Sequence, residues 1–147
     1  MYWRYMDKLN NSFKYAIMTY ESIKATLVAL TDGLLYISES ERPFTVLEVT
    51  GDTLTFLAEV SKLPAAGFSS PDAGDFFAKM IRNAAADPGD AVMMRLAKRY
   101  EALQQFMEAN LADIRLYRAG SVQVQLFIVG KTDGGRELAL QTGAVET

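Results

Sequence analysis

The segment at residues 122–129, which reads VQVQLFIV, constrains the fold of this chain more than any other. Its first half alternates apolar and polar residues, as a strand with one exposed face does, whereas residues 126–129 are apolar on both faces. A strand without a polar face needs protein packed against each side of its sheet. The sequence therefore predicts a sheet with helices on both of its faces.

Three other segments are predicted to be strands, and they lie at residues 44–49, which are rich in β-branched and apolar residues, and at residues 114–117 and 137–142. The connections at residues 119–120 and 132–135 contain glycine, which accepts a positive φ angle at little cost. Short connections of this kind fold neighbouring strands into antiparallel hairpins. We therefore expect a mostly antiparallel sheet of about four strands.

Apolar residues recur every three or four positions in the remaining segments, as they do on one face of a helix. The first of these helices runs from Leu9 to about Thr31, where Gly33 can supply a left-handed terminating residue. Further helices are expected at residues 53–63, from residue 75 to the break at residues 87–90, and at residues 91–110. The chain therefore has an α/β (α+β) composition.

The length of 147 residues suits a single domain, residues 1–147, with one hydrophobic core. The chain contains no cysteine and no histidine. Cysteine thiolates and histidine rings supply many of the nucleophiles, proton shuttles and metal ligands that work near neutral pH. We therefore expect a protein that is not an enzyme, binds no metal of its own and needs no cofactor.

The net charge is −3, from 18 acidic and 15 basic residues, and no dense cluster of lysine and arginine is present. Because nucleic-acid binding depends on such clusters, direct binding to DNA or RNA is disfavoured, whereas binding to a basic nucleic-acid enzyme is compatible with this charge. No segment approaches the roughly 20 apolar residues of a membrane span, and the N-terminus lacks a secretory signal. We expect no membrane contact and a cytoplasmic location.

Residues 38–41, which read SESE, form the densest group of polar side chains. Glu39 and Glu41 could act as a catalytic pair of carboxylates, one as acid and one as base. Alternatively, the serines bend the chain and the glutamates lie exposed in water. In a third interpretation, the segment is an acidic loop that replaces phosphates in front of a partner's lysine or arginine. Residue types alone leave the three interpretations open.

The last five residues, 143–147, are small or polar and end in Glu146 and Thr147. The α-carboxylate and the threonine hydroxyl group are hard oxygen ligands that could reach into a cleft and approach a bound Mg²⁺ ion. The alternative is a frayed chain end, which is common for terminal residues.

Two separated blocks resemble the nuclease A inhibitor (NuiA-like) family, whose members bind and block a sugar-non-specific nuclease. The first is residues 32–44, DGLLYISESERPF, which is similar to the family pattern D-G-L-L-x-x-S-E-S-E-x-P-F. The second begins with LYR at residues 116–118 and continues through residues 127–132 to VET at residues 145–147. The resemblance is weak over residues 52–90.

The resemblance implies a three-layer α/β/α sandwich of the PR-1-like kind and a nuclease as the protein partner. In the family, the first glutamate of the S-E-S-E pattern and the terminal threonine enter the nuclease cleft, and the threonine approaches the catalytic metal. The matching residues here are Glu39 and Thr147. Asp32, Glu41 and Glu146 are added as outer contacts because they lie nearby in the sequence.

Two features depart from the family pattern. Residues 1–16 are an N-terminal extension, which we expect to continue the first helix and which carries several aromatic residues. Arg42 stands where the family more often has an aromatic residue, and it adds positive charge beside the acidic segment. These departures keep open an alternative function, a protein-interaction module of the same fold with a non-nuclease partner.

Overall fold

The computed structural model describes residues 18–147. These residues form a mixed α+β structure with two antiparallel sheets. The elements follow one another as α2 (Tyr20–Thr31), β1 (Leu35–Ile37), β2 (Glu41–Pro43), β3 (Thr45–Val49), α3 (Thr53–Ser61), the 3-10 helix η1 (Ala65–Gly67), α4 (Ala73–Ala84), α5 (Ala91–Asn110), β4 (Ala112–Ala119), β5 (Gln123–Lys131) and β6 (Glu137–Val145). None of the helices within residues 18–147 combines the length and apolarity that a membrane crossing requires.

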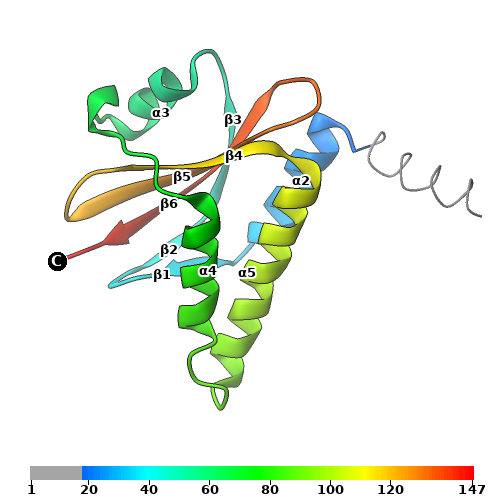
Figure 1. The fold of residues 1–147 in the computed structure, drawn as a ribbon, viewed down its shortest axis with the longest axis vertical. Coiled ribbons are helices and arrows are strands. Elements are labelled where there is room, and N and C mark those ends of the chain that lie inside the picture. Colours follow the sequence, from blue (N-terminus) through cyan, green and yellow to red (C-terminus); the bar gives the residue numbers. More distant parts are fainter. Residues whose placement is uncertain (1–17) are drawn as a thin grey trace, which may run out of the picture.

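The main sheet has four strands in the order β3-β6-β5-β4, and each neighbouring pair is antiparallel. They correspond to the strands predicted from the sequence, so the expectation of a mostly antiparallel sheet is confirmed. The expected glycine turns are present as well, with φ angles of +96° at Gly120 and +83° at Gly135. The second sheet is the antiparallel pair of β1 and β2, which lies beside the end of β6 (Figure 1).

Alternate residues of β5 are buried on opposite faces of the main sheet. Leu126 and Ile128 belong to the larger hydrophobic cluster, to which α2, α4 and α5 contribute. Phe127 and Val129 belong to a second cluster around Leu57 of α3. All four β5 side chains are at most 2% exposed. The prediction that protein covers both faces of this strand is therefore confirmed.

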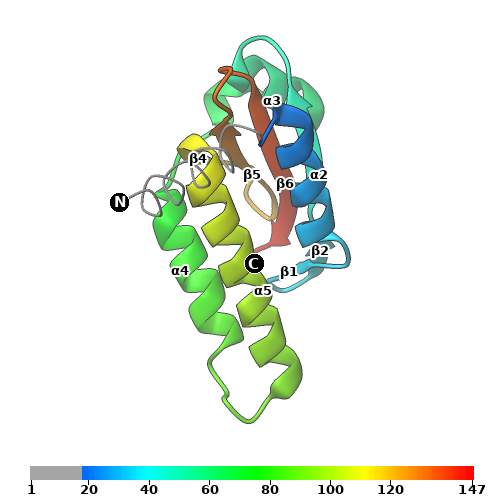
Figure 2. The ribbon, with the colours of Figure 1, turned by 90° about the vertical axis from the view of Figure 1, so that its right-hand side faces the viewer.

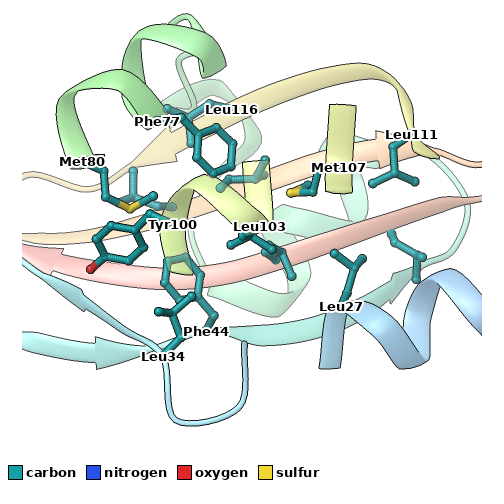
Figure 3. Close-up of a cluster of buried hydrophobic side chains, with 14 of the residues drawn as sticks. Leu27, Leu34, Phe44, Phe77, Met80, Tyr100, Leu103, Met107, Leu111 and Leu116 are labelled. Atoms are coloured by element: carbon teal, nitrogen blue, oxygen red, sulfur yellow. The ribbon is translucent and has the colours of Figure 1, made fainter. Parts of the chain in front are cut away.

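The helix α5 lies between α4 and α2 on one face of the main sheet (Figure 2). Its buried residues Tyr100, Leu103 and Met107 recur at spacings of three and four, so they share one side of the helix. Figure 3 shows Leu103 and Met107 between Phe77 of α4 and Leu27 of α2, and Tyr100 beside Met80 of α4. Because burial of each large apolar side chain contributes roughly 1.5–3 kcal/mol, α5 is central to the stability of this face.

Tyr100 connects α5 to the β1–β2 pair. Its hydroxyl group donates a short hydrogen bond to the backbone oxygen of Leu35 in β1. Burial raises the pKa of Tyr100 to about 12, so the hydroxyl group keeps its proton at neutral pH and remains a donor. Next to it, Tyr36 packs against Phe44 and Phe76, with ring centroids 6.4 Å and 5.4 Å apart. These contacts fix the hairpin against the core.

The first helix begins later than the sequence predicts. Thr19 has φ −70° and ψ 166°, which is not helical, and its hydroxyl group accepts a 3.1 Å hydrogen bond from the first turn of α2. It caps the helix, so the prediction of one continuous helix from Leu9 is wrong at this point. The predicted end is confirmed, because α2 stops at Thr31 and Gly33 has a φ angle of +68°. The predicted N-terminal extension, residues 1–16, lies outside the described residues.

The β1–β2 hairpin is not predicted by the sequence. Each strand has only three residues, and β2 ends in Pro43, a residue that disfavours regular strands. Ile37 pairs with Glu41, so residues 38–40 form the connection between the strands. The expected loop at residues 38–41 is therefore a hairpin turn, and its last residue belongs to β2.

The strand β6 extends to Val145, beyond the predicted end at residue 142. Residues 143–145 pair with residues 123–125 of β5. The interpretation of the last residues as a frayed end is therefore wrong for residues 143–145, because they belong to the sheet. In both views the chain end lies beside β1 (Figure 1, Figure 2).

Gly120 in the β4–β5 turn leaves no room for a side chain. A Cβ atom there would meet the backbone oxygen of Gln123 at 2.1 Å, and the φ angle of +96° disfavours other residues. Gly120→Ala is therefore expected to lower the free energy of unfolding by about 1–3 kcal/mol, as measured by urea denaturation. Gly134→Ala is the matched control, since nothing lies within 4 Å of its added Cβ atom. Equal stabilities of the two variants would show that the turn does not require glycine at position 120.

Candidate functional site

The β1–β2 turn carries Glu39 at its tip. The Ser38 N–H donates to the Ser40 carbonyl oxygen at 2.8 Å, and the Ser40 N–H donates to the Ser38 hydroxyl group at 3.2 Å. These hydrogen bonds close the turn and leave Glu39 exposed between two half-buried serines. The serines therefore bend the chain, as one interpretation of the sequence held.

Glu39 contacts the last residue of the chain, which is 108 positions away in the sequence. The Thr147 N–H donates to Glu39 Oε2 at 2.9 Å, and the Thr147 hydroxyl group donates to Glu39 Oε1 at 2.7 Å. Both residues are exposed. The structure thus brings together the two principal candidate residues from the sequence, and it holds two oxygen-rich groups at one place on the surface.

Backbone hydrogen bonds continue to the penultimate residue of the chain. The Val145 N–H donates to the Ser38 hydroxyl group at 3.3 Å, which connects β6 to the turn. The Glu146 N–H donates to the Val122 carbonyl oxygen at 2.9 Å, which connects the chain end to the start of β5. Thr147 is therefore the one residue beyond this ladder, and its position depends on its contact with the turn.

Glu146 forms an ion pair with Arg118 of β4. Nη1 and Nη2 of the arginine each lie 2.7 Å from one carboxylate oxygen, so the pair is bidentate. The hydrogen bonds from Arg118 lower the pKa of the Glu146 carboxyl group, and the same bonds raise the pKa of Arg118. The sequence had suggested Glu146 as a contact to a partner, whereas it did not single out Arg118, whose one signal was its place in the LYR block at residues 116–118.

A groove of about 690 Å³ lies beside these residues, between the chain end and α4. Tyr36 lines it, and burial, together with the charge of Glu146, raises the pKa of this phenol, so it stays neutral. The charged side chains that line the groove are the carboxylates of Glu39, Asp72, Asp75 and Glu146 and the cations of Lys79 and Arg118. With four carboxylates against two cations, the groove favours positively charged groups of a partner.

Two other candidates, Asp32 and Glu41, do not line this groove. Asp32 is the C-cap residue that follows α2, and its backbone oxygen accepts a 2.7 Å hydrogen bond from Arg99. Glu41 is exposed on β2. Because the carboxylate of Glu39 is bonded to Thr147, the geometry gives no support to a catalytic pair of Glu39 and Glu41. Within residues 18–147, no three acidic, histidine or cysteine side chains converge as a metal site.

The fold and the site define a mixed α+β protein that presents a carboxylate-bearing turn and its own last residue side by side on the surface. Residues 21–147 match the family model described as nuclease A inhibitor-like protein, NuiA, and the chain belongs to this family. The resemblance seen in the two sequence blocks is thereby confirmed. The family suggests an inhibitory, non-enzymatic role and a nuclease as the protein partner. A search of curated proteins found no match to the chain.

Glu146 is expected to make the stability of the protein depend on pH. Its pKa in the folded state is lowered from the ordinary value of 4.5, chiefly by the hydrogen bonds from Arg118. The ion pair therefore stabilises the fold above pH 4.5, and this stabilisation is lost as the pH falls through the lowered pKa.

Glu146→Gln should reduce the free energy of unfolding at neutral pH by about 0.2–1 kcal/mol, the usual range for exposed pairs. The difference from the wild type should shrink as the pH falls below 4.5, because wild-type Glu146 then becomes neutral too. Urea denaturation at neutral and acidic pH measures both values. A difference that stays constant across this range would show that the ion pair is not its source.

Proposed function

We propose that this protein inhibits a sugar-non-specific, metal-dependent nuclease by occupying its active site. The Glu39 turn and the α-carboxylate of Thr147 enter the cleft together, and the protein contributes no metal or cofactor of its own. One observation carries the proposal: Thr147 donates hydrogen bonds of 2.9 Å and 2.7 Å to the Glu39 carboxylate, and both residues are exposed. Membership in the nuclease A inhibitor-like family supports a nuclease as the partner.

Carboxylates can take the place of a phosphodiester in such a cleft. A nuclease holds the anionic oxygens of its substrate with a divalent metal ion and neighbouring cationic side chains. Glu39 and the Thr147 α-carboxylate offer oxygens of the same charge without a bond that the enzyme can cleave. The α-carboxylate, as the hard oxygen ligand at the end of the chain, approaches the metal of the nuclease. Inhibition is therefore competitive with nucleic acid.

The hydrogen bonds between Glu39 and Thr147 prepare this pair of anionic groups before binding. Less conformational freedom is lost when the two groups are already ordered, which favours tight binding. Like charges that are held close together repel one another, and cations of a partner relieve this repulsion. A basic cleft is therefore a better partner surface than a neutral one.

Glu146, Glu41 and Asp32 are proposed as outer contacts to the nuclease. Glu146 lines the same groove as Glu39 and Thr147, whereas Glu41 and Asp32 do not. Contacts at the edge of an interface add little affinity but affect the rate of association through their charge. We therefore assign the main share of the affinity to Glu39 and Thr147.

Three further assignments accompany the proposal. The fold is a three-layer α/β/α sandwich of the PR-1-like kind, which is supported by hydrophobic clusters on both faces of the main sheet. Residues 1–147 form a single domain, with residues 1–16 as an N-terminal extension. The protein works in the cytoplasm on a protein partner, and it does not bind nucleic acid directly, which its net charge of −3 disfavours.

An interaction module for a non-nuclease partner is the alternative, and Arg42 motivates it. Arg42 comes directly after the acidic segment at residues 38–41, and its positive charge disfavours a basic partner surface there. Its guanidinium group donates to Gln123 Oε1 of β5 at 3.4 Å, so part of its hydrogen-bonding capacity is used within the molecule. Gln123 is neutral, so this contact orients the guanidinium group toward β5 and leaves its positive charge unchanged.

Cleavage of DNA in the presence of the Glu39→Gln variant tests the proposal. Glutamine has nearly the shape of glutamate but no charge, so the nuclease loses one anionic contact. We expect the inhibition constant against a Mg²⁺-dependent, sugar-non-specific nuclease to rise at least about 30-fold, which corresponds to about 2 kcal/mol. Deletion of Thr147 should weaken inhibition by a similar factor. Glu59→Gln is the matched control on α3, and it should leave the inhibition constant unchanged.

Three outcomes of this experiment would count against the proposal in different ways. If the nuclease stays fully active in an excess of the wild-type protein, the inhibitory function is overturned. Inhibition that survives both Glu39→Gln and the loss of Thr147 would keep the function but remove this site. If this protein inhibits no nuclease and binds a non-nuclease partner instead, the interaction module is favoured.

A further inference from the structure

A bidentate ion pair lies next to the proposed site, and its arginine, Arg118, is not among the proposed contacts to the nuclease. Arg118 Nη1 and Nη2 are 2.7 Å from the two carboxylate oxygens of Glu146. Glu146 directly precedes Thr147, the residue that contacts Glu39. The pair therefore connects β4, at the edge of the main sheet, to the segment that carries the proposed anionic group.

The backbone of Arg118 is held from both sides. Within the main sheet it pairs with Leu126 of β5, and on the outer edge its N–H and C=O groups exchange 2.9 Å hydrogen bonds with Ser69. The Ser70 hydroxyl group donates a further 2.7 Å hydrogen bond to the Leu116 carbonyl oxygen. These contacts occupy an edge of β4 that would otherwise be open. The guanidinium group of Arg118 thus extends from a fixed backbone.

We propose that Arg118 is the positioning residue that holds Thr147 in place for binding to a partner. Without Arg118, Glu146 keeps its N–H bond to the Val122 carbonyl oxygen, but its side chain is released. The contact between Thr147 and Glu39 is then an exposed contact at a chain end, where conformational freedom is greatest. With Arg118 bound, Glu146 is fixed through its backbone and its side chain, and Thr147 extends from a fixed point.

Glu146 then has a second role besides that of an outer contact. Both of its carboxylate oxygens accept hydrogen bonds from Arg118, so they are less available to the cations of a partner. Glu146 therefore acts through the position of Thr147. The effect on inhibition rests on the proposed function, whereas the position of Thr147 in the free protein is measurable without any nuclease.

Release of Thr147 by a carboxypeptidase reports how often the chain end leaves its place, because cleavage needs a locally opened segment. Arg118→Met keeps most of the aliphatic side chain and removes the guanidinium group. We expect it to release Thr147 roughly fivefold faster than the wild type does, which is the upper effect of an exposed ion pair. Arg115→Met is the matched control, because Arg115 lies on the same strand and pairs with Asp113 instead.

The control variant should release Thr147 at the wild-type rate. The two variants should have similar Tm values, since each loses one exposed ion pair. Equal release rates from Arg118→Met and Arg115→Met would overturn the proposal. A structural role of Arg118 in general stability would lower Tm without a selective effect on Thr147, which would also overturn it.

A charge exchange provides a second, independent test. The single variant Glu146→Arg places two arginines opposite each other, whereas the double variant Arg118→Glu with Glu146→Arg restores an opposite-charge pair. Both variants have the same C-terminal sequence, so the carboxypeptidase meets the same substrate. We expect slower release from the double variant than from the single one. Equal rates would contradict a positioning role, even if Arg118→Met failed to fold.

Measurements of nuclease inhibition separate this inference from the proposed function. Faster release of Thr147 together with weaker inhibition in Arg118→Met supports both. If Arg118→Met releases Thr147 faster but the wild-type protein inhibits no nuclease, the proposed function is removed. The positioning role of Arg118 is then left intact. Faster release with unchanged inhibition would overturn the inference that Arg118 holds Thr147 for binding.

Discussion

The burial of β5 on both faces is the constraint on which the rest of this structure depends. Phe127 and Ile128 are 0% and 1% exposed and belong to opposite hydrophobic clusters. A shift of one residue would turn each of these side chains to the wrong face, so the core fixes the register of the strand. Register also pairs Gln123 with Val145, which determines where β6 ends. The end of β6, from which Thr147 extends, is therefore determined by apolar packing inside the molecule.

The candidate site joins two short segments to this rigid base. One is the β1–β2 turn, which is attached to the helical layer through the hydrogen bond from Tyr100 to Leu35 and the packing of Tyr36 on Phe76. The other is the chain end, which continues the backbone ladder of β6. Functional groups on loops and chain ends gain defined positions when a packed scaffold holds their bases. Here the scaffold holds the turn and the chain end side by side, so that Glu39 contacts Thr147.

The proposed inhibitor needs no reactive group, and this requirement agrees with a chain that lacks histidine and cysteine. Its task is electrostatic: an acidic surface, shaped before binding, competes with a polyanion for a basic cleft. In the proposed function, the carboxylates around the groove and the hydrogen bonds between Glu39 and Thr147 serve that task. Arg118 forms an ion pair with Glu146 beside them. In the role proposed for Arg118, this ion pair restricts the motion of the chain end.

The sequence by itself determined the four strands of the main sheet, most of the helices and the cover on both faces of β5, because these features follow from local periodicity and composition. It also singled out Glu39 and Thr147, through the family resemblance. It did not reveal the β1–β2 hairpin, whose three-residue strands are too short for a periodic signal. Nor did it reveal the bond between Arg118 and Glu146, 28 positions apart. Only the tertiary structure decided these contacts, because strand register and helix packing bring together residues that no local pattern relates.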